Sequence, residues 1–165
     1  MCGGDKDTFR WAFRALGLEF GVSPRWMSAL GIANGFDNGR FCGHSVLQYD
    51  LVTPTGFSRP PPLFVHSNLL KHLGGSGLGK GSLFKQIRRM SDDYSSNPSL
   101  NYAHSFVYTG GGRGMCLDLD WHDNAPLEVK DELWVETVNV DEVEGAVFDG
   151  FEDAWFDEGG RIGGW

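Results

Sequence analysis

The segment LFVHSNLLKH, residues Leu63–His72, decides the fold prediction for this chain of 165 residues. It begins with a short apolar run, Leu63 to Val65, that directly follows three prolines. Proline cannot donate to a sheet ladder and belongs before a strand, and so short a run fits a buried strand better than a helix. Polar side chains follow at once, where open α/β sheets place their ligands. The segment therefore predicts a strand that leads into a functional site.

Three polar side chains of this segment suggest its chemistry. His66 can bind a divalent metal through a neutral ring nitrogen, and Lys71 can place a compact positive charge on a phosphate. If a helical turn begins near Ser67, Asn68 and Lys71 share a face because they are three residues apart. The same spacing also fits a core histidine beside a solvated lysine, so both interpretations remain open at this point.

Charge is distributed unevenly along the chain. The formal net charge is −8, and the composition, 41% hydrophobic and 22% charged, is that of a globular domain. Residues 1–117 hold 12 basic and 7 acidic side chains, whereas residues 118–165 hold 2 basic and 15 acidic ones. The first part can attract an anionic ligand, and the acidic end is typical of a solvated face or a tail. Nucleic acid is not an expected partner, because that needs a basic patch with interleaved aromatic residues.

The three cysteines, Cys2, Cys42 and Cys116, lie far apart without C-x-x-C spacing, so a zinc site is not expected. One disulfide with a remaining thiol and three reduced thiols are equally consistent with this count. The sequence shows no signal-peptide pattern and no run of about 18 apolar residues. No targeting or membrane-spanning segment is therefore expected within this chain.

Hydrophobic periodicity and turn residues predict the remaining elements. Residues 5–17 have the apolar stripe of an amphipathic helix, with Asp7 near its start and Gly17 at its end. Residues 18–40 look irregular, and no fold is assigned to the tail from Phe148. The other predicted elements are strands at 45–52, 105–109, 115–119 and 133–140, a glycine-rich loop at 73–82 and a short helix at 82–90.

Asp118 and Asp120 lie one residue apart at the end of a predicted strand, with His122 close behind. Two carboxylates and an imidazole can chelate Mg²⁺ or Mn²⁺, which would suit a small metal-dependent hydrolase. Alternating charges along a half-exposed strand produce the same three residues without any metal. Both interpretations stay open from the sequence.

Three segments occur in an order and spacing that resemble a known family. They are GGDKDTFRWAF (Gly3–Phe13), FCGHSVLQYD (Phe41–Asp50) and PLFVHSNLLKH (Pro62–His72). Together they resemble the C-terminal half of the fungal α-mannosyltransferases of glycosyltransferase family 71. Members of that family are Golgi type II membrane enzymes that add mannose to N-glycan or O-glycan chains. The resemblance covers residues 3–90.

The resemblance implies a GT-A-like α/β fold with a mixed sheet and flanking helices, of which this chain is a truncated, C-terminal part. Residues 1–147 would form the acceptor-side half of the catalytic domain, and residues 148–165 an acidic, glycine-rich tail whose composition suits disorder. The implied location is the lumenal side of the Golgi membrane. Attachment would come only from an N-terminal anchor that this chain does not contain.

By the same resemblance, GDP-mannose is the donor, a mannose-containing glycan is the acceptor and Mn²⁺ is the cofactor. Departure of a diphosphate builds up negative charge, which a metal ion and a lysine stabilise. The implied site residues are His66 for the metal, Lys71 and Asn68 for the donor phosphates, Gln48 for the acceptor, and Asp5 and Asp7 for catalysis. An alternative is a non-catalytic carbohydrate-binding module that uses exposed tryptophan faces, with Trp11, Trp26 and Trp121 as candidates.

Overall fold

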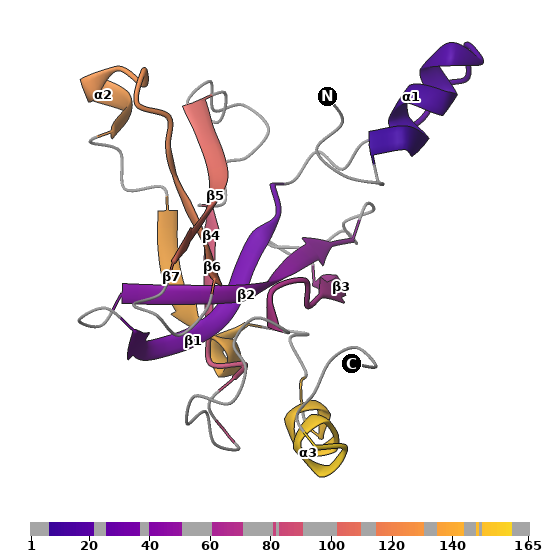
Figure 1. The fold of residues 1–165 in the computed structure, drawn as a ribbon. Helices are drawn as coiled ribbons and strands as arrows, with labels where there is room; N and C mark the ends of the chain where they lie inside the picture. Colours follow the sequence, from indigo (N-terminus) through magenta and orange to yellow (C-terminus); the bar gives the residue numbers. More distant parts are fainter. Residues whose placement is uncertain are drawn as a thin grey trace.

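A computed structural model describes residues 7–21, 26–36, 40–50, 61–70, 81, 83–90, 102–109, 115–130, 135–143, 148 and 150–159. These residues form one sheet with short helices around it (Figure 1). The strands are β1 (Ser28–Phe36), β2 (Arg40–Tyr49), β3 (Pro62–His66), β4 (Gln86–Met90), β5 (Ala103–Thr109), β6 (Met115–Trp121) and β7 (Val135–Asn139). The helices are α1 (Asp7–Ala15), α2 (Leu127–Lys130), α3 (Phe151–Asp157) and the 3₁₀ helix η4 (Val140–Glu142).

Strand β2 organises the sheet. The strand order is β5-β6-β2-β1-β4-β7, and β3 pairs with the C-terminal half of β2. Each pairing between described strands is antiparallel. The predicted α/β class is thus confirmed as a mostly antiparallel sheet with helices, whereas the parallel strands of a mixed sheet are not found among the described residues.

Both faces of the sheet are buried where β1 and β2 meet. Ala29 and Leu30 are consecutive residues of β1, so their side chains point to opposite faces. Each belongs to a different buried cluster. The first cluster contains Ala29, Phe41, Leu69, Met90, Ala103, Leu117 and Leu119, and the second contains Leu30, Leu47, Tyr49 and Ile87. This two-sided burial supplies the main hydrophobic stabilisation of the fold.

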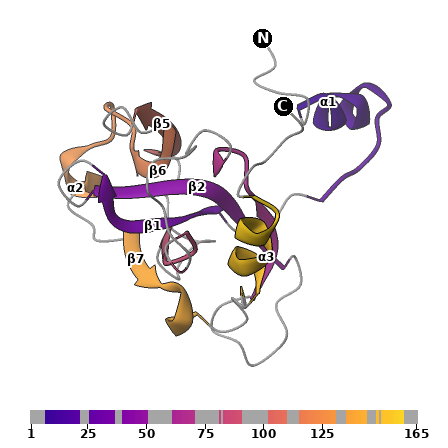
Figure 2. The ribbon, with the colours of Figure 1, turned by 60° about the horizontal axis from the view of Figure 1, so that its bottom comes forward.

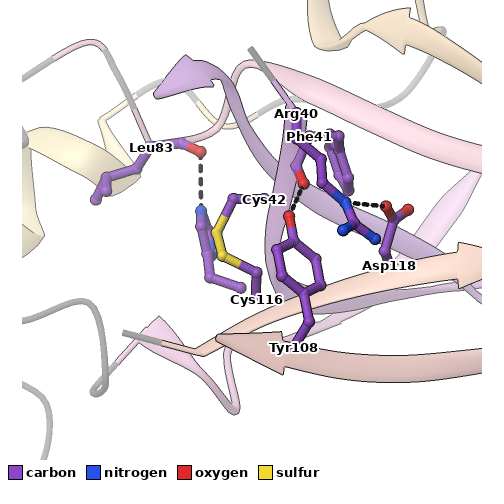
Figure 3. Close-up of a disulfide and its surroundings, with 8 residues drawn as sticks. Arg40, Phe41, Cys42, Leu83, Tyr108, Cys116 and Asp118 are labelled. Atoms are coloured by element: carbon purple, nitrogen blue, oxygen red, sulfur yellow. Dashed lines mark hydrogen bonds and ion pairs between the residues drawn. A yellow bond between two sulfur atoms is a disulfide. The ribbon is translucent and has the colours of Figure 1, made fainter. Parts of the chain in front are cut away.

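A disulfide between Cys42 and Cys116 joins β2 to β6 (Figure 3). Gly43 pairs with Leu117 beside it, and a Cβ atom at Gly43 would lie 2.5 Å from the Leu117 carbonyl oxygen. Only glycine therefore permits this approach. The Tyr108 hydroxyl donates to the Phe41 carbonyl, which ties β5 to the same region. Of the two cysteine states left open by the sequence, the structure has one disulfide, and Cys2 lies outside the described residues.

Several predicted elements are confirmed. α1 lies within the helix predicted at 5–17, and β5, β6 and β7 overlap the strands predicted at 105–109, 115–119 and 133–140. β3 and β2 also match the predicted strands in part. The apolar stripe of α1 is exposed, however, and α1 stands apart from the sheet in both ribbon views (Figures 1 and 2). The predicted loop at 73–82 lies almost entirely outside the described residues.

Other predictions were wrong. The region 18–40 contains the central strand β1, and the predicted helix at 82–90 contains strand β4. β4 pairs with β1 on one side and with β7 on the other. These two pairings give hydrogen-bond partners to more of its backbone N–H and C=O groups than an isolated helical turn would. β3 was predicted to be buried, but Leu63, Phe64 and Val65 are exposed because β3 lies at an edge.

The tail from Phe148, for which no fold was expected, contains the helix α3. Trp155 and Phe156 of α3 pack against the buried cluster formed by Ile32, Cys42, Leu70, Leu83 and Cys116. Acidic residues in its first turn, Glu152 and Asp153, suit the positive end of the helix dipole. Disorder is therefore not a property of residues 150–159.

We predict that the double variant Cys42→Ala/Cys116→Ala loses about 4 kcal/mol of unfolding free energy, because the crosslink spans 74 residues and constrains the unfolded chain. Urea denaturation monitored by circular dichroism measures this loss. Cys2→Ala is the matched control and should leave the midpoint unchanged. A double variant as stable as the control would show that the disulfide does not hold β6 to β2.

Candidate functional site

The pairing of β2 with β3 brings two predicted site residues together. Val46 lies opposite His66, and Gln48 lies opposite Phe64. Residues directly opposite share a face of the sheet, as do alternate residues along a strand. Gln48 and His66 are therefore diagonal neighbours on one face, and both side chains are exposed. The predicted acceptor residue and the predicted metal ligand thus share one accessible surface.

The segment after β3 folds back onto β2. The Asn68 N–H donates to the His66 carbonyl at 3.0 Å, and the Leu69 N–H donates to the His44 carbonyl at 3.0 Å. Leu69 and Leu70 are buried, which anchors this turn in the core. The Oδ1 atom of Asn68 is buried without a hydrogen-bond partner among the described residues. An unpaired buried acceptor is costly, so this atom suits a donor group that approaches from a ligand or from another part of the chain.

The structure does not show where the remaining predicted site residues lie relative to the Gln48–His66 surface. Asp5 and Lys71 lie outside the described residues, and of Asp7 only the backbone, the first residue of α1, is described. The proximity of Lys71 to His66 and the catalytic role of Asp5 and Asp7 therefore remain predictions.

The described residues do not form a metal site on their own. No three His, Cys, Asp or Glu side chains within these ranges lie close enough together to hold an ion. His66, the ligand predicted for Mn²⁺, is described, so a complete Mn²⁺ site there would need further ligands from outside the described ranges. Of the two interpretations left open for Asp118, Asp120 and His122, the structure does not support the metal site, because all three residues are described and do not lie together as a group that could hold an ion.

Asp118 is instead part of an arginine cluster. Its side chain is 5% exposed, and its Oδ1 atom lies 2.7 Å from Arg88 Nε. Its Oδ2 atom lies 3.9 Å from Arg40 Nε (Figure 3). Burial raises the pKa of Asp118, and the charge of Arg88 opposes that shift. The Arg40 guanidinium lies 4.0 Å from the centre of the Tyr108 ring. The carboxylate therefore links β6 to β4 and β2 through charge-assisted contacts and is not available as a metal ligand.

A buried polar chain, missed in the sequence, lies beneath the β2–β3 surface. His44 Nδ1 is 2.8 Å from Ser45 Oγ, and Ser45 Oγ is 2.9 Å from Ser67 Oγ. His44 Nε2 is 2.8 Å from the Leu83 carbonyl oxygen, and a carbonyl only accepts. A neutral His44 therefore carries its proton on Nε2, and its Nδ1 faces the Ser45 Oγ atom. The Ser45 hydroxyl donates to Ser67 Oγ, so Ser45 links the ring to the turn after β3.

A β-bulge explains how the side chains of the consecutive residues His44 and Ser45 come close enough to form a hydrogen bond. On β1, Leu30 and Gly31 are consecutive, but their partners on β2 are Ser45 and Gly43. His44 is the extra residue, and such an insertion changes the direction of a side chain. In a regular strand the adjacent residues His44 and Ser45 of FCGHSVLQYD would lie on opposite faces. Two adjacent polar residues within a largely apolar strand were therefore the sequence feature that could have indicated the bulge.

Burial lowers the pKa of His44 to about 4, although the hydrogen bond to Leu83 and the charge of Glu152 oppose the shift. The ring is fully buried and meets the edge of Phe84 at a centroid distance of 5.4 Å. His44 is therefore neutral at physiological pH and acts as a fixed hydrogen-bonding link.

An apolar groove of about 260 Å³ lies between β3 and the start of α3. It is lined by Pro62, Leu63, Val65, Ser67, Phe84, Phe148 and Phe151. Val65 lies between Phe64 and His66 in the regular part of the pairing, so Val65 in the groove and the Gln48–His66 surface lie on opposite faces of β3. Ser67 connects this groove to the buried polar chain.

The three tryptophans proposed for a carbohydrate-binding module differ in how exposed their side chains are. Trp11 is 54% exposed on α1, whereas Trp26 and Trp121 pack against a buried cluster. Two of the three candidate faces are therefore partly used by the core, which leaves little basis for a tryptophan platform.

The chain matches no family model, no curated protein and no solved structure in the three comparisons made. Within the described residues, no helix has both the length and the apolar character needed to cross a membrane.

We predict that the unfolding free energy falls by about 3 kcal/mol between neutral pH and pH 4 because of His44. The pKa of His44 is depressed in the folded state, so below its ordinary value of 6.5 the unfolded chain binds more protons. Stability is therefore full above pH 6.5 and is lost as the pH falls toward 4. Urea denaturation across this window measures the slope.

The variant His44→Gln removes the titrating ring, so this part of the pH dependence should disappear even though stability at neutral pH decreases. The exposed His122 provides the matched control, and His122→Ala should keep the wild-type slope. A slope unchanged in His44→Gln would mean that the ring is not buried in its neutral form.

Proposed function

We propose that this chain is the acceptor-side part of a GT-A-like α-mannosyltransferase that takes mannose from GDP-mannose and adds it to a mannose-containing glycan. The observation that carries the proposal is the direct pairing of two of the three segments on which the resemblance rests. FCGHSVLQYD contains most of β2 and PLFVHSNLLKH contains β3, and the two strands are antiparallel neighbours. Segments that build one site are expected to meet in space in this way.

The arrangement of the polar groups supports this proposal. Gln48 and His66 share an exposed face, and Asn68 follows with a buried oxygen that lacks a partner among the described residues. An exposed amide can bind a sugar hydroxyl, and an exposed neutral imidazole can ligate a metal ion. Asn68, fixed by its backbone bond to His66, would then orient a group that donates to its Oδ1 atom.

In the proposed reaction, a bound Mn²⁺ would supply electrostatic stabilisation of the leaving diphosphate. His66 is the residue of the described chain that would hold it. Lys71 would place a positive charge on the phosphates, Gln48 would orient the acceptor hydroxyl, and Asp5 and Asp7 would border the reacting sugar. The buried His44 link holds the turn after β3, so it would keep Asn68 in position without touching the substrate.

The disulfide supports a lumenal location for the proposed enzyme. Disulfides persist in oxidising compartments of the secretory route and are rare in reducing ones. The Cys42–Cys116 crosslink therefore fits the lumenal side of the Golgi membrane better than a reducing compartment.

We predict Mn²⁺-dependent binding of GDP-mannose, measured by isothermal titration calorimetry with and without the metal. His66→Ala should weaken binding about tenfold or more, because it removes a metal ligand. Lys71→Ala should weaken binding about tenfold, because it removes a charge-assisted contact to phosphate. His122→Ala and Lys85→Ala replace exposed residues of the same types elsewhere and should bind as the unchanged chain does.

Metal-independent GDP-mannose binding, or equal affinity of His66→Ala and His122→Ala, would contradict the role given to His66. No GDP-mannose binding by the chain with Mn²⁺ would contradict the proposed function. Binding of a mannose oligosaccharide that needs neither nucleotide nor metal would favour the carbohydrate-binding module instead.

A further inference from the structure

The side chain of Arg40, the first residue of β2, is held in place by aromatic rings of β5. Its guanidinium carbon lies 4.0 Å from the centre of the Tyr108 ring (Figure 3) and 5.6 Å from the centre of the Phe106 ring. The Tyr108 hydroxyl donates to the Phe41 carbonyl, so the ring beside Arg40 is itself tied to β2. A guanidinium group that is fixed before a ligand arrives loses little conformational freedom on binding.

A second guanidinium group approaches the same carboxylate from another strand. The Nε atom of Arg88, on β4, lies 2.7 Å from Asp118 Oδ1, and the Nε atom of Arg40 lies 3.9 Å from Asp118 Oδ2. The side chains of Arg40 and Arg88 are 46% and 32% exposed, whereas the side chain of Asp118 is 5% exposed. Two solvent-accessible guanidinium groups therefore lie beside one buried carboxylate.

The positive charge of this arginine pair is only partly offset. Arg88 forms the closer ion pair with Asp118, and one carboxylate offsets one guanidinium group. Arg40 lies beyond hydrogen-bond distance of Asp118, and no oxygen of the described residues accepts a hydrogen bond from its guanidinium group. The charge of Asp120 also reaches Asp118, but Asp120 is exposed to water, which screens it. The N–H groups of Arg40 are therefore available to an anion.

Balancing the charge of Asp118 explains the position of Arg88 but not that of Arg40. A buried carboxylate without a partner would be costly, and Arg88 provides that partner. Arg40 adds a second positive charge at a longer distance. Both arginines belong to residues 1–117, which hold 12 basic and 7 acidic side chains, and this excess predicts an anionic ligand.

We propose that Arg40 and Arg88 bind a phosphate group. A phosphate has several acceptor oxygens and can carry two negative charges, so it can bridge guanidinium groups that come from two strands. A carboxylate has one planar pair of oxygens, which matches a single guanidinium group. Arg40 begins β2, whereas Gln48 lies near the other end of β2, where β3 pairs. The phosphate site is therefore distinct from the Gln48–His66 surface and does not depend on the proposed function.

Proton–nitrogen correlation NMR of the arginine Nε–H groups tests the proposal on the full, unchanged chain. Sodium phosphate is added at neutral pH, while NaCl is adjusted to keep the ionic strength constant. We expect the signals of Arg40 and Arg88 to shift together and to saturate, with a dissociation constant on the order of 1 mM. Sodium acetate should bind at least about tenfold more weakly. Unmoved signals of both arginines, or equal binding of acetate, would overturn the proposal.

Phenyl phosphate distinguishes the possible sources of the phosphate group. An affinity equal to that of inorganic phosphate would show that the ion itself is a sufficient ligand. An affinity about tenfold higher would indicate an aromatic phosphate ester, whose ring contacts the partly exposed Phe106 beside Arg40. Either result supports the site, because both ligands carry the same group.

Variants then locate the site. Arg40→Gln should weaken phosphate binding about tenfold, because it removes a charge-assisted contact. Arg14→Gln is the matched control and should not change the affinity, because Arg14 is also an exposed arginine over an aromatic ring, 5.7 Å from the centre of Trp11. Asp120→Asn should increase the affinity about twofold, because it removes a nearby negative charge. Unchanged affinity in Arg40→Gln, or an equal loss in Arg14→Gln, would overturn the proposal.

Discussion

The imidazole of His44 is the link on which the arrangement of this molecule depends. Through Ser45 it reaches Ser67, after β3, and through the Leu83 carbonyl it reaches the segment before β4. The Leu83 N–H in turn donates to Glu152 of α3 at 2.6 Å. A buried polar group without partners is costly, so these bonds favour one relative position of β2, β3, β4 and α3. The exposed surface of Gln48 and His66 and the groove of Phe151 are both set by that position.

Much of the strand content follows from the sequence. Apolar runs in the sequence indicated β2, β3, β5, β6 and β7. Some of these runs alternate, because a half-buried strand has apolar residues at every second position, and others are short and continuous. β1 was missed because its small residues hide the pattern. Gly31 is required where the Cys42 carbonyl approaches too closely for a side chain, so the residue that breaks the strand signal is the one that permits the pairing. β4 was mistaken for a helix because its apolar residues also fit helical spacing. Its pairing with β1 and β7, which makes it a strand, involves residues distant in the sequence.

The candidate site was predictable in part. The family resemblance and the strand period together indicated His66 and Gln48, and their position on one face follows from the register of β2 and β3. The register of β2 against β3 could not be predicted from the sequence, because it depends on how two separate segments pack together. The buried chain from His44 to Ser67 was not predictable, because the contact between His44 and Ser45 depends on a single inserted residue in β2. The role of Asp118 stayed open between a metal ligand and a strand charge, since the sequence does not reveal that Arg88 lies 2.7 Å from it.

The protonation state of His44 tests this account most directly. Long-range proton–nitrogen correlation NMR of the ¹⁵N-labelled protein distinguishes the two neutral tautomers and the imidazolium. The account predicts a neutral ring with its proton on Nε2 at neutral pH, unchanged down to about pH 5 because burial holds its pKa near 4. A proton on Nδ1, or a titration near the ordinary value of 6.5, would contradict the account.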